Sequence, residues 1–299
     1  MKMSTATLVE NKQTVREAFN FTVDKFPLGG PDGLKTNLKG LFRSDNNQHI
    51  GKVVSTKYVP HQTEDVVLLT EAAQVAFDGN IEVKCHFNNG HYVEISPSVE
   101  YRKSIFGEKD NIFPRIMIDA SYNGLAFKLI LGYFRDLCKN MVMMNEVRTA
   151  CVSIRHSRKL PEQMEQLIKQ FSSLKEGWQS LSSMIERMEN TEVNLASFMN
   201  QVYGDPKDSE RGRTIHEDRT QIIFTRLADE RLRSGRPAMD RLNTKVSAWE
   251  AFNAVQGFAQ HITTRKEGTT DFDKVILAAK TTEVHTAQKL ALQLTGMGV

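Results

Sequence analysis

Two thiols and an imidazole gather in the segment between Ile118 and Leu160, at spacings that could support chemistry. Cys138, Cys151 and His156 carry the side chains of a thiol–imidazole pair or of three zinc ligands. Their spacing fits no usual zinc knuckle, and no fourth ligand is evident nearby. Both cysteines stand among apolar neighbours, and buried cysteine commonly behaves as a small hydrophobic residue. We therefore predict that the two thiols belong to the core.

Asp119 is the acidic candidate of this segment, because paired carboxylates can bind a metal ion for phosphodiester cleavage. No acidic partner lies near it in the sequence, and Asp119 and Ser121 are better explained as residues that form the following turn. The sequence also lacks the P-loop, GxSxG, HExxH and EF-hand patterns. It thus favours a protein without catalytic residues, cofactor or bound metal. A metal-dependent nuclease is the weakest alternative.

His156 stands in a basic corner, where Arg155, Arg158 and Lys159 surround it directly after a strand pattern. Neighbouring cations disfavour the charged form of a histidine. A helix pattern begins at Pro161, and the free N–H groups at a helix N-terminus favour an anion such as phosphate. The corner is therefore either an anion contact or an ordinary polar junction, and both alternatives stay open.

Further basic residues occur in two other places. Arg43 and Lys57 flank the first predicted hairpin, and Tyr58 beside them offers a ring that could stack on a base. Arginines that alternate with acidic residues are typical of a solvated helix face, but Arg233 and Arg236 lie in a cationic segment after such a face. Single-stranded nucleic acid binds to a basic groove with stacking aromatic rings. The predicted contacts are Arg43, Lys57, Tyr58, Arg155, His156, Arg158, Lys159, Arg233 and Arg236.

The chain of 299 residues is 40% hydrophobic and 25% charged, which suits one large domain or two small ones. Its formal net charge of +3 permits a polyanionic partner without demanding one. Three cysteines without a CxxC pattern indicate reduced thiols in a cytoplasm. The N-terminus has no apolar secretion signal, and the longest apolar runs are shorter than the roughly 20 residues of a membrane span. We therefore expect a cytoplasmic protein without a membrane partner.

Alternating apolar residues and Asn-Gly dipeptides predict a β-rich first half that positions these side chains. Residues 40–59 predict a hairpin, and Asn89-Gly90 and Asn123-Gly124 predict two more. Residues 149–157 predict a further strand. Thr63 is the expected N-cap of a helix. The expected buried face of that helix contains Val66, Leu69, Ala73 and Phe77.

From Pro161 onwards apolar residues recur at steps of three and four, which predicts one long amphipathic helix. Further helical patterns cover residues 192–203, 214–233, 242–264 and 271–294. Strands followed by helices predict an α+β fold, in which a hairpin-rich half packs with the long helix before a helical C-terminal region. The expected divisions are an N-terminal arm (1–40), an α+β core (41–190) and the helical region (191–299).

The helical pattern over residues 242–264 suggests a different function. If its apolar face were exposed, it would form a surface for a host protein, as in a counter-defence or regulatory module. The same face is more simply a part of the core, and we favour that interpretation. The residues of this face are Val246, Trp249, Phe252, Val255 and Phe258.

Several motifs occur in an order that resembles a known family. Between about Gly40 and His261 they read GLFRSDNNQHIGKVVSTKYVPHQTEDVVLLTEAA, DASYNGLAF, RDLCKN, SIRHS and SAWEAFNAVQGFAQH. The chain resembles the phage/plasmid-like protein family, domain of unknown function 932. Met141, directly after RDLCKN, departs from the more polar residue of many relatives. The resemblance implies a gene of a phage, prophage or plasmid that acts in a bacterial cytoplasm, and it supplies no catalytic residues.

The predicted order of hairpins, long helix and helical end is also broadly similar to that of phage single-strand annealing proteins. Those proteins bind single strands in a basic groove without ATP, and they form rings or filaments. We therefore expect a homo-oligomer that binds or anneals single-stranded DNA in recombination or replication, without an enzymatic step. The alternative function is the protein-interaction module.

Overall fold

The computed structural model describes residues 15–30, 32, 35–79, 81–97, 101–106, 110–143, 149–237, 239, 244–263 and 271–297. Strands dominate the first half of these residues and helices the second, which confirms the predicted α+β class. The chain divides into two compact units. The first unit comprises residues 1–101, 114–132 and 148–177, and the second comprises residues 102–113, 133–147 and 178–299. The predicted domain boundaries near residues 40 and 190 remain predictions.

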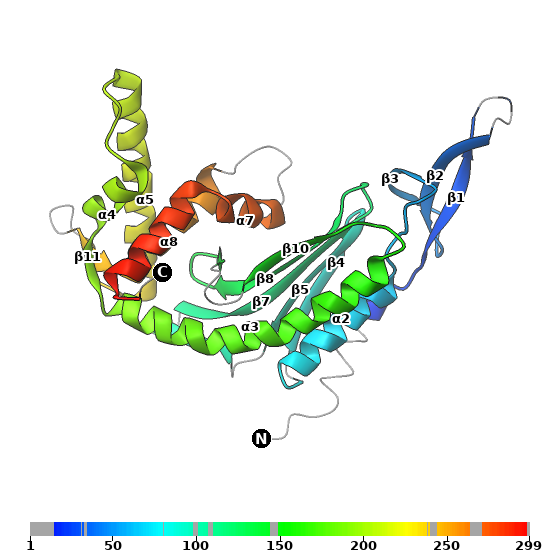
Figure 1. Ribbon diagram of the computed structural model, residues 1–299, viewed down its shortest axis with the longest axis horizontal. Helices are drawn as coiled ribbons and strands as arrows, with labels where there is room; N and C mark the ends of the chain where they lie inside the picture. The colour runs from blue at the N-terminus through cyan, green and yellow to red at the C-terminus, as the bar shows by residue number, and fades with distance from the viewer. Residues whose placement is uncertain are drawn as a thin grey trace. The chain divides into compact units, whose positions relative to one another are not determined.

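The first unit begins with a three-stranded antiparallel sheet in the order β1-β2-β3 (Figure 1). Its strands are β1 (Val23–Gly29), β2 (Lys35–Arg43) and β3 (His49–Ser55). The hairpin predicted over residues 40–59 is confirmed, because β2 and β3 pair with Phe42 opposite His49 beside the turn. One face of this sheet belongs to the core, and its buried residues are Leu41, Ile50 and Val54.

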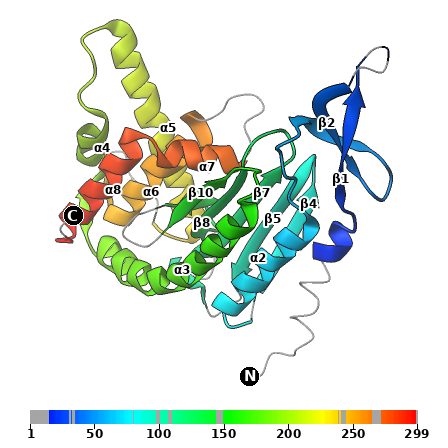
Figure 2. The same cartoon turned by 45° about the vertical axis from the view of Figure 1, so that its right-hand side comes forward.

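A larger antiparallel sheet has the order β10-β8-β7-β5-β4, and most of its residues belong to the first unit. Its strands are β4 (Ile81–Phe87), β5 (Gly90–Pro97), β7 (Asp110–Ser121), β8 (Phe127–Arg135) and β10 (Ala150–Ile154). The hairpins predicted at the two Asn-Gly dipeptides are β4–β5 and β7–β8, and the predicted strand over residues 149–157 is β10. Figures 1 and 2 show α2 (Thr63–Ala76) and the first part of α3 (Leu160–Glu189) along one face of this sheet.

The N-cap of helix α2 lies one residue earlier than predicted. Gln62 is the N-cap, and its N–H donates a 2.7 Å hydrogen bond to the Asp65 carboxylate. The prediction of Thr63 as the cap was wrong, because its hydroxyl lies 2.8 Å from the main-chain oxygen of Phe19 and 3.1 Å from that of Phe21, and donates there. The predicted buried face is confirmed, since its four residues are fully buried: Val66, Leu69, Ala73 and Phe77.

Gly51 lies where β3 approaches the turn between β7 and β8, with a φ of +63°. A Cβ at this position would overlap the main-chain oxygen of Tyr122. We expect Gly51→Ala to lower the free energy of unfolding by at least about 2 kcal/mol, because left-handed strain and a backbone clash act together. The control is Gly124→Ala, where φ is +73° but a Cβ meets nothing within 4 Å. Urea denaturation measures both variants, and equal losses would contradict the close approach as the cause.

Helix α3 is the long helix predicted from Pro161, which is its second residue. Proline is tolerated there because N–H groups in the first turn have no hydrogen-bond partner within the helix. Its apolar stripe is largely buried as predicted. The fully or nearly buried members are Leu167, Phe171, Leu174, Leu181, Ile185 and Met188. Ile168 and Trp178 are partly exposed.

The second unit contains the remaining helices. They are α4 (Leu195–Tyr203), α5 (Glu210–Ser234), α6 (Ala248–Phe258), the π-helix η4 (Ala259–Thr263), α7 (Asp271–Ala279) and α8 (Thr282–Leu294). The short strands of this unit are β6 (Lys103–Phe106), β9 (Asn140–Val142), β11 (Glu192–Asn194) and β12 (Lys245–Ser247). β11 pairs with β12, β6 with the start of β7, and β9 with the end of β8. Helix α6 packs against α8 (Figure 2).

Three helix predictions were wrong in detail. The pattern over residues 242–264 includes the strand β12 before α6 starts. The pattern over residues 271–294 forms two helices, because the Thr281 hydroxyl accepts a hydrogen bond from the Val284 N–H and caps α8. The pattern over residues 192–203 begins with β11 before α4 starts. The face of the pattern over residues 242–264 is core, as favoured, since every member is buried: Val246, Trp249, Phe252, Val255 and Phe258. Across the described residues, none of the helices is both long and apolar enough to cross a bilayer.

Candidate nucleic-acid interface

Two segments that are far apart in the sequence meet in the first unit. The N–H of Val59 donates to the main-chain oxygen of His156 over 3.2 Å, and His156 Nδ1 donates to the main-chain oxygen of Val59 over 3.2 Å. From β1, Lys25 Nζ donates to the main-chain oxygen of Tyr58 over 2.8 Å. These bonds fix the loop after β3 beside the end of β10, and they bring several predicted contacts together.

Four of the predicted cations gather at this junction, which we call the cationic corner: Lys57, Arg155, Arg158 and Lys159. All four side chains are exposed. None of them has an acidic partner within the part of the chain that the structure describes. An exposed cation without an internal partner keeps its charge available for a phosphate.

His156 is at the centre of the cationic corner but is only 8% exposed. Burial lowers the pKa of His156 to about 4, so its imidazole is neutral at pH 7. The Tyr58 ring stacks on it, with centroids 4.6 Å apart and an interplanar angle of 26°. His156 therefore positions the corner and is poorly placed to bind phosphate as a cation. The stacked face of Tyr58 is occupied, so only its other face remains for a base.

Two further buried histidines lie beside His156. His61 Nε2 is 2.9 Å from His91 Nδ1, and the His61 ring centroid is 5.2 Å from that of His156. The Thr63 hydroxyl, 3.4 Å from His91 Nε2, already donates to main-chain oxygens and therefore accepts from His91. His91 Nδ1 is then an acceptor, and His61 Nε2 is the donor to it. The bonds thus fix one neutral tautomer for each ring.

We call His61, His91 and His156 the histidine cluster. Burial lowers the pKa of His61 well below its usual range, and the neighbouring His91 and His156 add to this effect. Burial also lowers the pKa of His91 to about 3. Tyr122 completes the packing, since its ring stacks on His61 at 4.3 Å and its hydroxyl donates to the main-chain oxygen of His61 over 2.8 Å.

Sequence reasoning singled out His156 but missed His61, His91 and the Tyr122 ring that packs on them, because these residues come from separate elements. His61 precedes the N-cap of α2, His91 follows the turn at Asn89-Gly90, and Tyr122 precedes Gly124 in the next hairpin turn. Each residue by itself is an ordinary polar aromatic residue beside a turn. The one available signal was that both hairpin turns carry such a residue at the same end of the strands.

Arg43 has less charge available for a ligand than its sequence position predicts. Its guanidinium makes two hydrogen bonds to the Asp45 carboxylate, of 2.9 and 2.6 Å. It also lies 3.9 Å from the centroid of the Phe21 ring, in cation–π geometry. These contacts give Arg43 a structural role at the end of β2.

Arg233 and Arg236 belong to the second unit, where both hold internal ion pairs. Arg233 is exposed and lies 3.0 Å from Asp229 one helical turn earlier. Arg236 is largely buried and pairs with Glu189 at 3.0 Å and with Glu250. Burial lowers the pKa of Arg236, although the two carboxylates act in the opposite direction. A guanidinium enclosed by two carboxylates is a poor candidate for phosphate contact.

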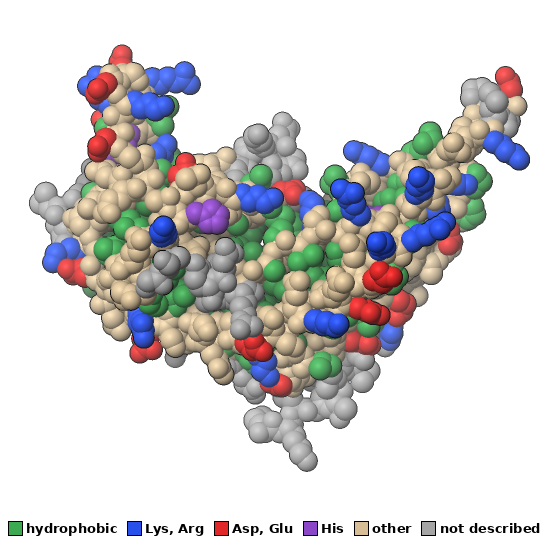
Figure 3. All heavy atoms as spheres, in the orientation of Figure 1, with side chains coloured by type: hydrophobic (Ala, Val, Ile, Leu, Met, Phe, Trp, Pro, Cys, Tyr) green, Lys and Arg blue, Asp and Glu red, His purple; other side chains and the backbone are tan. Residues whose placement is uncertain are grey.

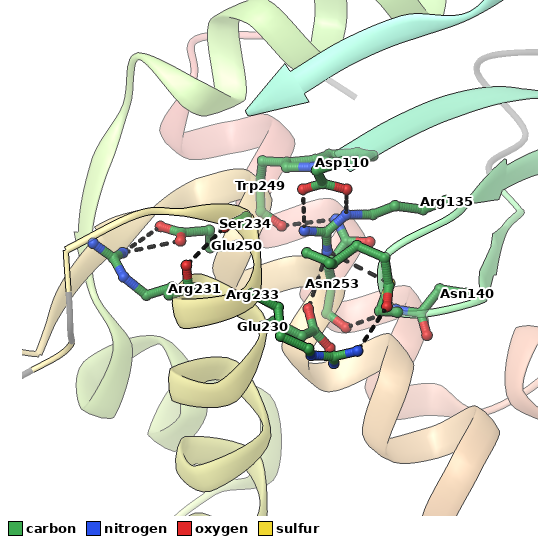
Figure 4. A network of polar contacts seen from close by, with 12 residues as sticks. Asp110, Arg135, Asn140, Glu230, Arg231, Arg233, Ser234, Trp249, Glu250 and Asn253 are labelled. Carbon is green, nitrogen blue, oxygen red and sulfur yellow. Dashed lines mark hydrogen bonds and ion pairs between the residues drawn. The ribbon is translucent and has the colours of Figure 1, made fainter. Parts of the chain in front are cut away.

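A buried polar network occupies the second unit around Arg135 (Figure 4). The Arg135 guanidinium makes two hydrogen bonds to Asp110, of 2.9 and 2.6 Å, and approaches Glu230 at 3.2 Å. The side chains of all three are at most 5% exposed. Nearby, Arg231 binds both oxygens of Glu250 at 2.9 Å. Each of these charges has an opposite charge within reach, so the network resembles a structural core more than an open site.

The same network includes strand β9. Asn140 Nδ2 donates to the main-chain oxygen of Asn253 over 3.2 Å. The Met141 N–H donates to Gln260 Oε1 over 3.1 Å, and the Met141 oxygen accepts from Gln260 at 2.8 Å and from Gln256 at 2.9 Å. The Met141 side chain is 1% exposed. Its apolar type therefore suits its place in the core, while its main chain makes the polar contacts.

The thiol and carboxylate candidates form no reactive site in the described residues. Cys138 is buried as predicted, and burial raises the pKa of its thiol to about 12. The prediction that Cys151 belongs to the core was wrong, because Cys151 is exposed on β10. Asp119 lies within β7 opposite Tyr92, and Ser121 Oγ accepts from the N–H of Asn123 in the following turn, as expected. No group of three or more His, Cys, Asp or Glu side chains in the described part of the chain is arranged to hold a metal ion.

Comparison with known proteins identifies the family. The model of a domain of unknown function, DUF932, matches residues 51–290, which is most of the chain. The chain belongs to the DUF932 family. No curated protein and no solved structure matches it. The DUF932 match includes all four residues of the cationic corner and the network around Arg135.

Proposed function

We propose that this DUF932 chain is a non-enzymatic protein of a phage, prophage or plasmid that binds single-stranded DNA. We further propose that it anneals complementary strands as a homo-oligomer in a bacterial cytoplasm. The observation that supports DNA binding is the cationic corner, with four exposed cations that have no acidic partner in the described residues. The mobile-element origin is supported by the motif resemblance.

The contrast between the two groups of predicted cations supports this assignment. Arg43, Arg233 and Arg236 are each held by a carboxylate of the chain itself. The cationic corner has its charges on two hydrogen-bonded segments, so several phosphates of one strand can be contacted without ordering a flexible loop. Preorganised cations release counterions from a polyanion at little cost in chain entropy.

The alternative functions have less support. A host-protein surface on residues 242–264 needs the apolar face of α6 to be exposed, but Trp249, Phe252 and Val255 are fully buried. A nuclease needs carboxylates arranged around a metal ion, and the described residues contain no such group. DNA binding at the cationic corner is therefore the function that the geometry supports best.

Fluorescence anisotropy with labelled single- and double-stranded oligonucleotides at two salt concentrations tests the proposal. We expect Arg155→Glu with Arg158→Glu to weaken single-strand binding at low salt by at least about tenfold, because two phosphate contacts become repulsive. The slope of log affinity against log salt should fall by about 1.4 for two lost contacts on a single strand. Oligomer mass is measured in the same samples.

The matched control is Lys280→Glu with Lys289→Glu, which changes the net charge equally at two exposed positions of the second unit. Its affinity should stay within about twofold of the parent chain, apart from the long-range effect of net charge. Equal losses in the two double variants would remove the cationic corner from the proposal. No binding by the parent chain at low salt would remove DNA binding altogether.

A further inference from the structure

The three-stranded sheet carries a second apolar face that is open to solvent. Phe26, Leu38 and Val53 are 51%, 50% and 45% exposed. Phe26 lies opposite Gly40, and Leu38 shares the face of Gly40 because residues two apart on a strand point the same way. The rings of Phe26 and Phe42 meet edge to face with centroids 5.8 Å apart. These aromatic and aliphatic side chains therefore form one continuous surface.

Val53 belongs to this surface because of the alternation along β3. Its neighbour Val54 lies opposite Lys39 and is 6% exposed, on the face that also buries Leu41 and Ile50. Val53 must then point to the opposite side. We call Phe26, Leu38, Phe42 and Val53 the open face. Exposed apolar surfaces of this kind commonly mark a binding site.

Gly40 lies on the side of β2 that carries the open face, and it is buried against the Phe42 ring. A Cβ at Gly40 would lie 2.6 Å from the Phe42 ring and 3.2 Å from Leu28. The ring of Phe42 can therefore lie over the backbone of β2 beside Phe26. Two aromatic rings on one exposed surface suit planar ligands.

The segment that forms the three-stranded sheet is cationic as a whole, although Asp24 lies opposite Phe42 and shares the open face with it. Residues 23–57 contain six Lys and Arg residues against three Asp residues, a net charge of +3 that equals that of the whole chain. Figure 3 shows Lys and Arg side chains interleaved with hydrophobic ones over this sheet. A second copy of the same cationic surface would be repelled, whereas a nucleic acid would be attracted.

The open face also adjoins the cationic corner. β3 ends at Ser55, two residues before Lys57, and Leu38 lies opposite Ser55. Lys25 of β1 donates to the main-chain oxygens of Thr56 and Tyr58, which ties the sheet to the corner. A strand whose phosphates contact the corner is therefore within reach of the sheet.

We propose that the open face binds the unstacked bases of the single strand whose phosphates contact the cationic corner. This inference rests on the proposed function. Phe26 and Phe42 stack on bases, while Leu38 and Val53 extend the apolar surface. Phe26 thus takes the role that the sequence assigns to Tyr58, whose ring is stacked on His156. Base stacking on aromatic rings is tolerant of sequence, so the preference is for single strands and not for a particular sequence.

Oligonucleotides with and without bases separate the two kinds of contact. An abasic strand keeps every phosphate but offers nothing to the open face. We expect the parent chain to bind the base-containing strand about tenfold or more tightly than an abasic strand of equal length. Phe26→Ala with Leu38→Ala should lower affinity for the base-containing strand by roughly tenfold and leave the abasic strand unchanged. The Arg155→Glu, Arg158→Glu variant should lose affinity for both strands.

The matched control is Leu68→Ala with Leu125→Ala, which truncates two apolar side chains of 44% and 52% exposure elsewhere in the first unit. It should retain the preference for bases. Phe26→Trp keeps a ring at the open face, should retain the preference, and provides a fluorescence signal that bases quench. Urea denaturation of every variant verifies that it is folded.

The outcomes are distinguishable. Binding that depends on Arg155 and Arg158 but is equal for the two strands overturns the base surface and leaves the proposed function intact. No binding to either strand overturns both. If Phe26→Ala with Leu38→Ala lowers the oligomer mass while the base preference persists, the open face is an interface between copies of the chain and the inference is wrong.

Discussion

Lowering the pH from 7 to 5 is expected to reduce the free energy of unfolding by about 2 kcal/mol through His91 alone, and the buried His61 adds to this loss. Both rings are fully buried, and burial lowers the pKa of each in the folded chain. In the unfolded chain their pKa returns to about 6.5, so below that pH the unfolded state binds protons that the folded state does not. Stability is therefore lost as the pH falls below 6.5.

Each histidine contributes about 1.4 kcal/mol for every pH unit below 6.5, until the pH reaches its folded pKa. His156 adds to the loss down to its folded pKa of about 4. Urea denaturation at pH 5, 6 and 7, followed by circular dichroism, measures the effect. Histidine Cε1–H resonances give an independent reading, since three of them should not titrate between pH 7 and 5.

The control for the acid effect is His91→Gln, which removes one titrating ring from the histidine cluster. The slope of its free energy of unfolding against pH should be smaller by about 1.4 kcal/mol per pH unit, which corresponds to one proton. In the parent chain the free energy of unfolding must fall at pH values where the far-UV spectrum still shows a folded chain. A pH-independent free energy of unfolding, or titration of the three cluster histidines near pH 6.5, would show that the cluster is hydrated and not buried.

Arg135→Met is expected to lower the free energy of unfolding by about 3–5 kcal/mol, because it leaves buried carboxylates without their counter-charge. Asp110 is fully buried and receives two hydrogen bonds from Arg135, and Glu230 receives a third. Methionine fills a similar volume, so the loss reports on charge and hydrogen bonding more than on a cavity. Urea denaturation of the parent and variant chains measures it.

Two comparisons interpret that loss. Lys245→Met removes a cation whose pair with Glu192 is exposed in the same unit, and it should leave the denaturation midpoint nearly unchanged. Arg135→Met with Asp110→Asn and Glu230→Gln removes the charges together and should recover much of the lost stability. A single Arg135→Met variant as stable as the parent would show that the network is hydrated.

Local patterns predicted most of the first unit. Asn89-Gly90 and Asn123-Gly124 mark the two turns, and the hairpins around them formed as expected. The type I′ geometry of such a dipeptide did not form, because φ is positive only at Asn89 in the first and only at Gly124 in the second. The buried face of α2 and the stripe of α3 follow from helical periodicity. The cap of α2 was misplaced because Thr63 has a competing acceptor more than 40 residues earlier in the chain. A periodic pattern contains no information about such a partner.

The candidate site shows the same limit more clearly. Arg158 and Arg236 are equally plausible phosphate contacts in the sequence, since both lie in short basic segments. Only the folded chain reveals that Glu189, 47 residues from Arg236, pairs with it. The pair of His61 and His91 was invisible for the same reason, because the two residues meet across 30 residues. Residue type and spacing find candidate charges, whereas long-range pairing decides which charges are available.

The glutamines that bind Met141 satisfy main-chain groups at the free edge of β9 and so protect this edge from pairing with other molecules. β9 pairs with β8 on one side, and a strand edge with unpaired N–H and C=O groups would recruit strands of other molecules. The carboxamide of Gln260 presents an acceptor and a donor to Met141 in the manner of a neighbouring strand, and Gln256 adds a second donor. Gln256 of α6 and Gln260 of η4 thereby take the place of a further strand at Met141, where a proline or a charged residue would otherwise discourage pairing.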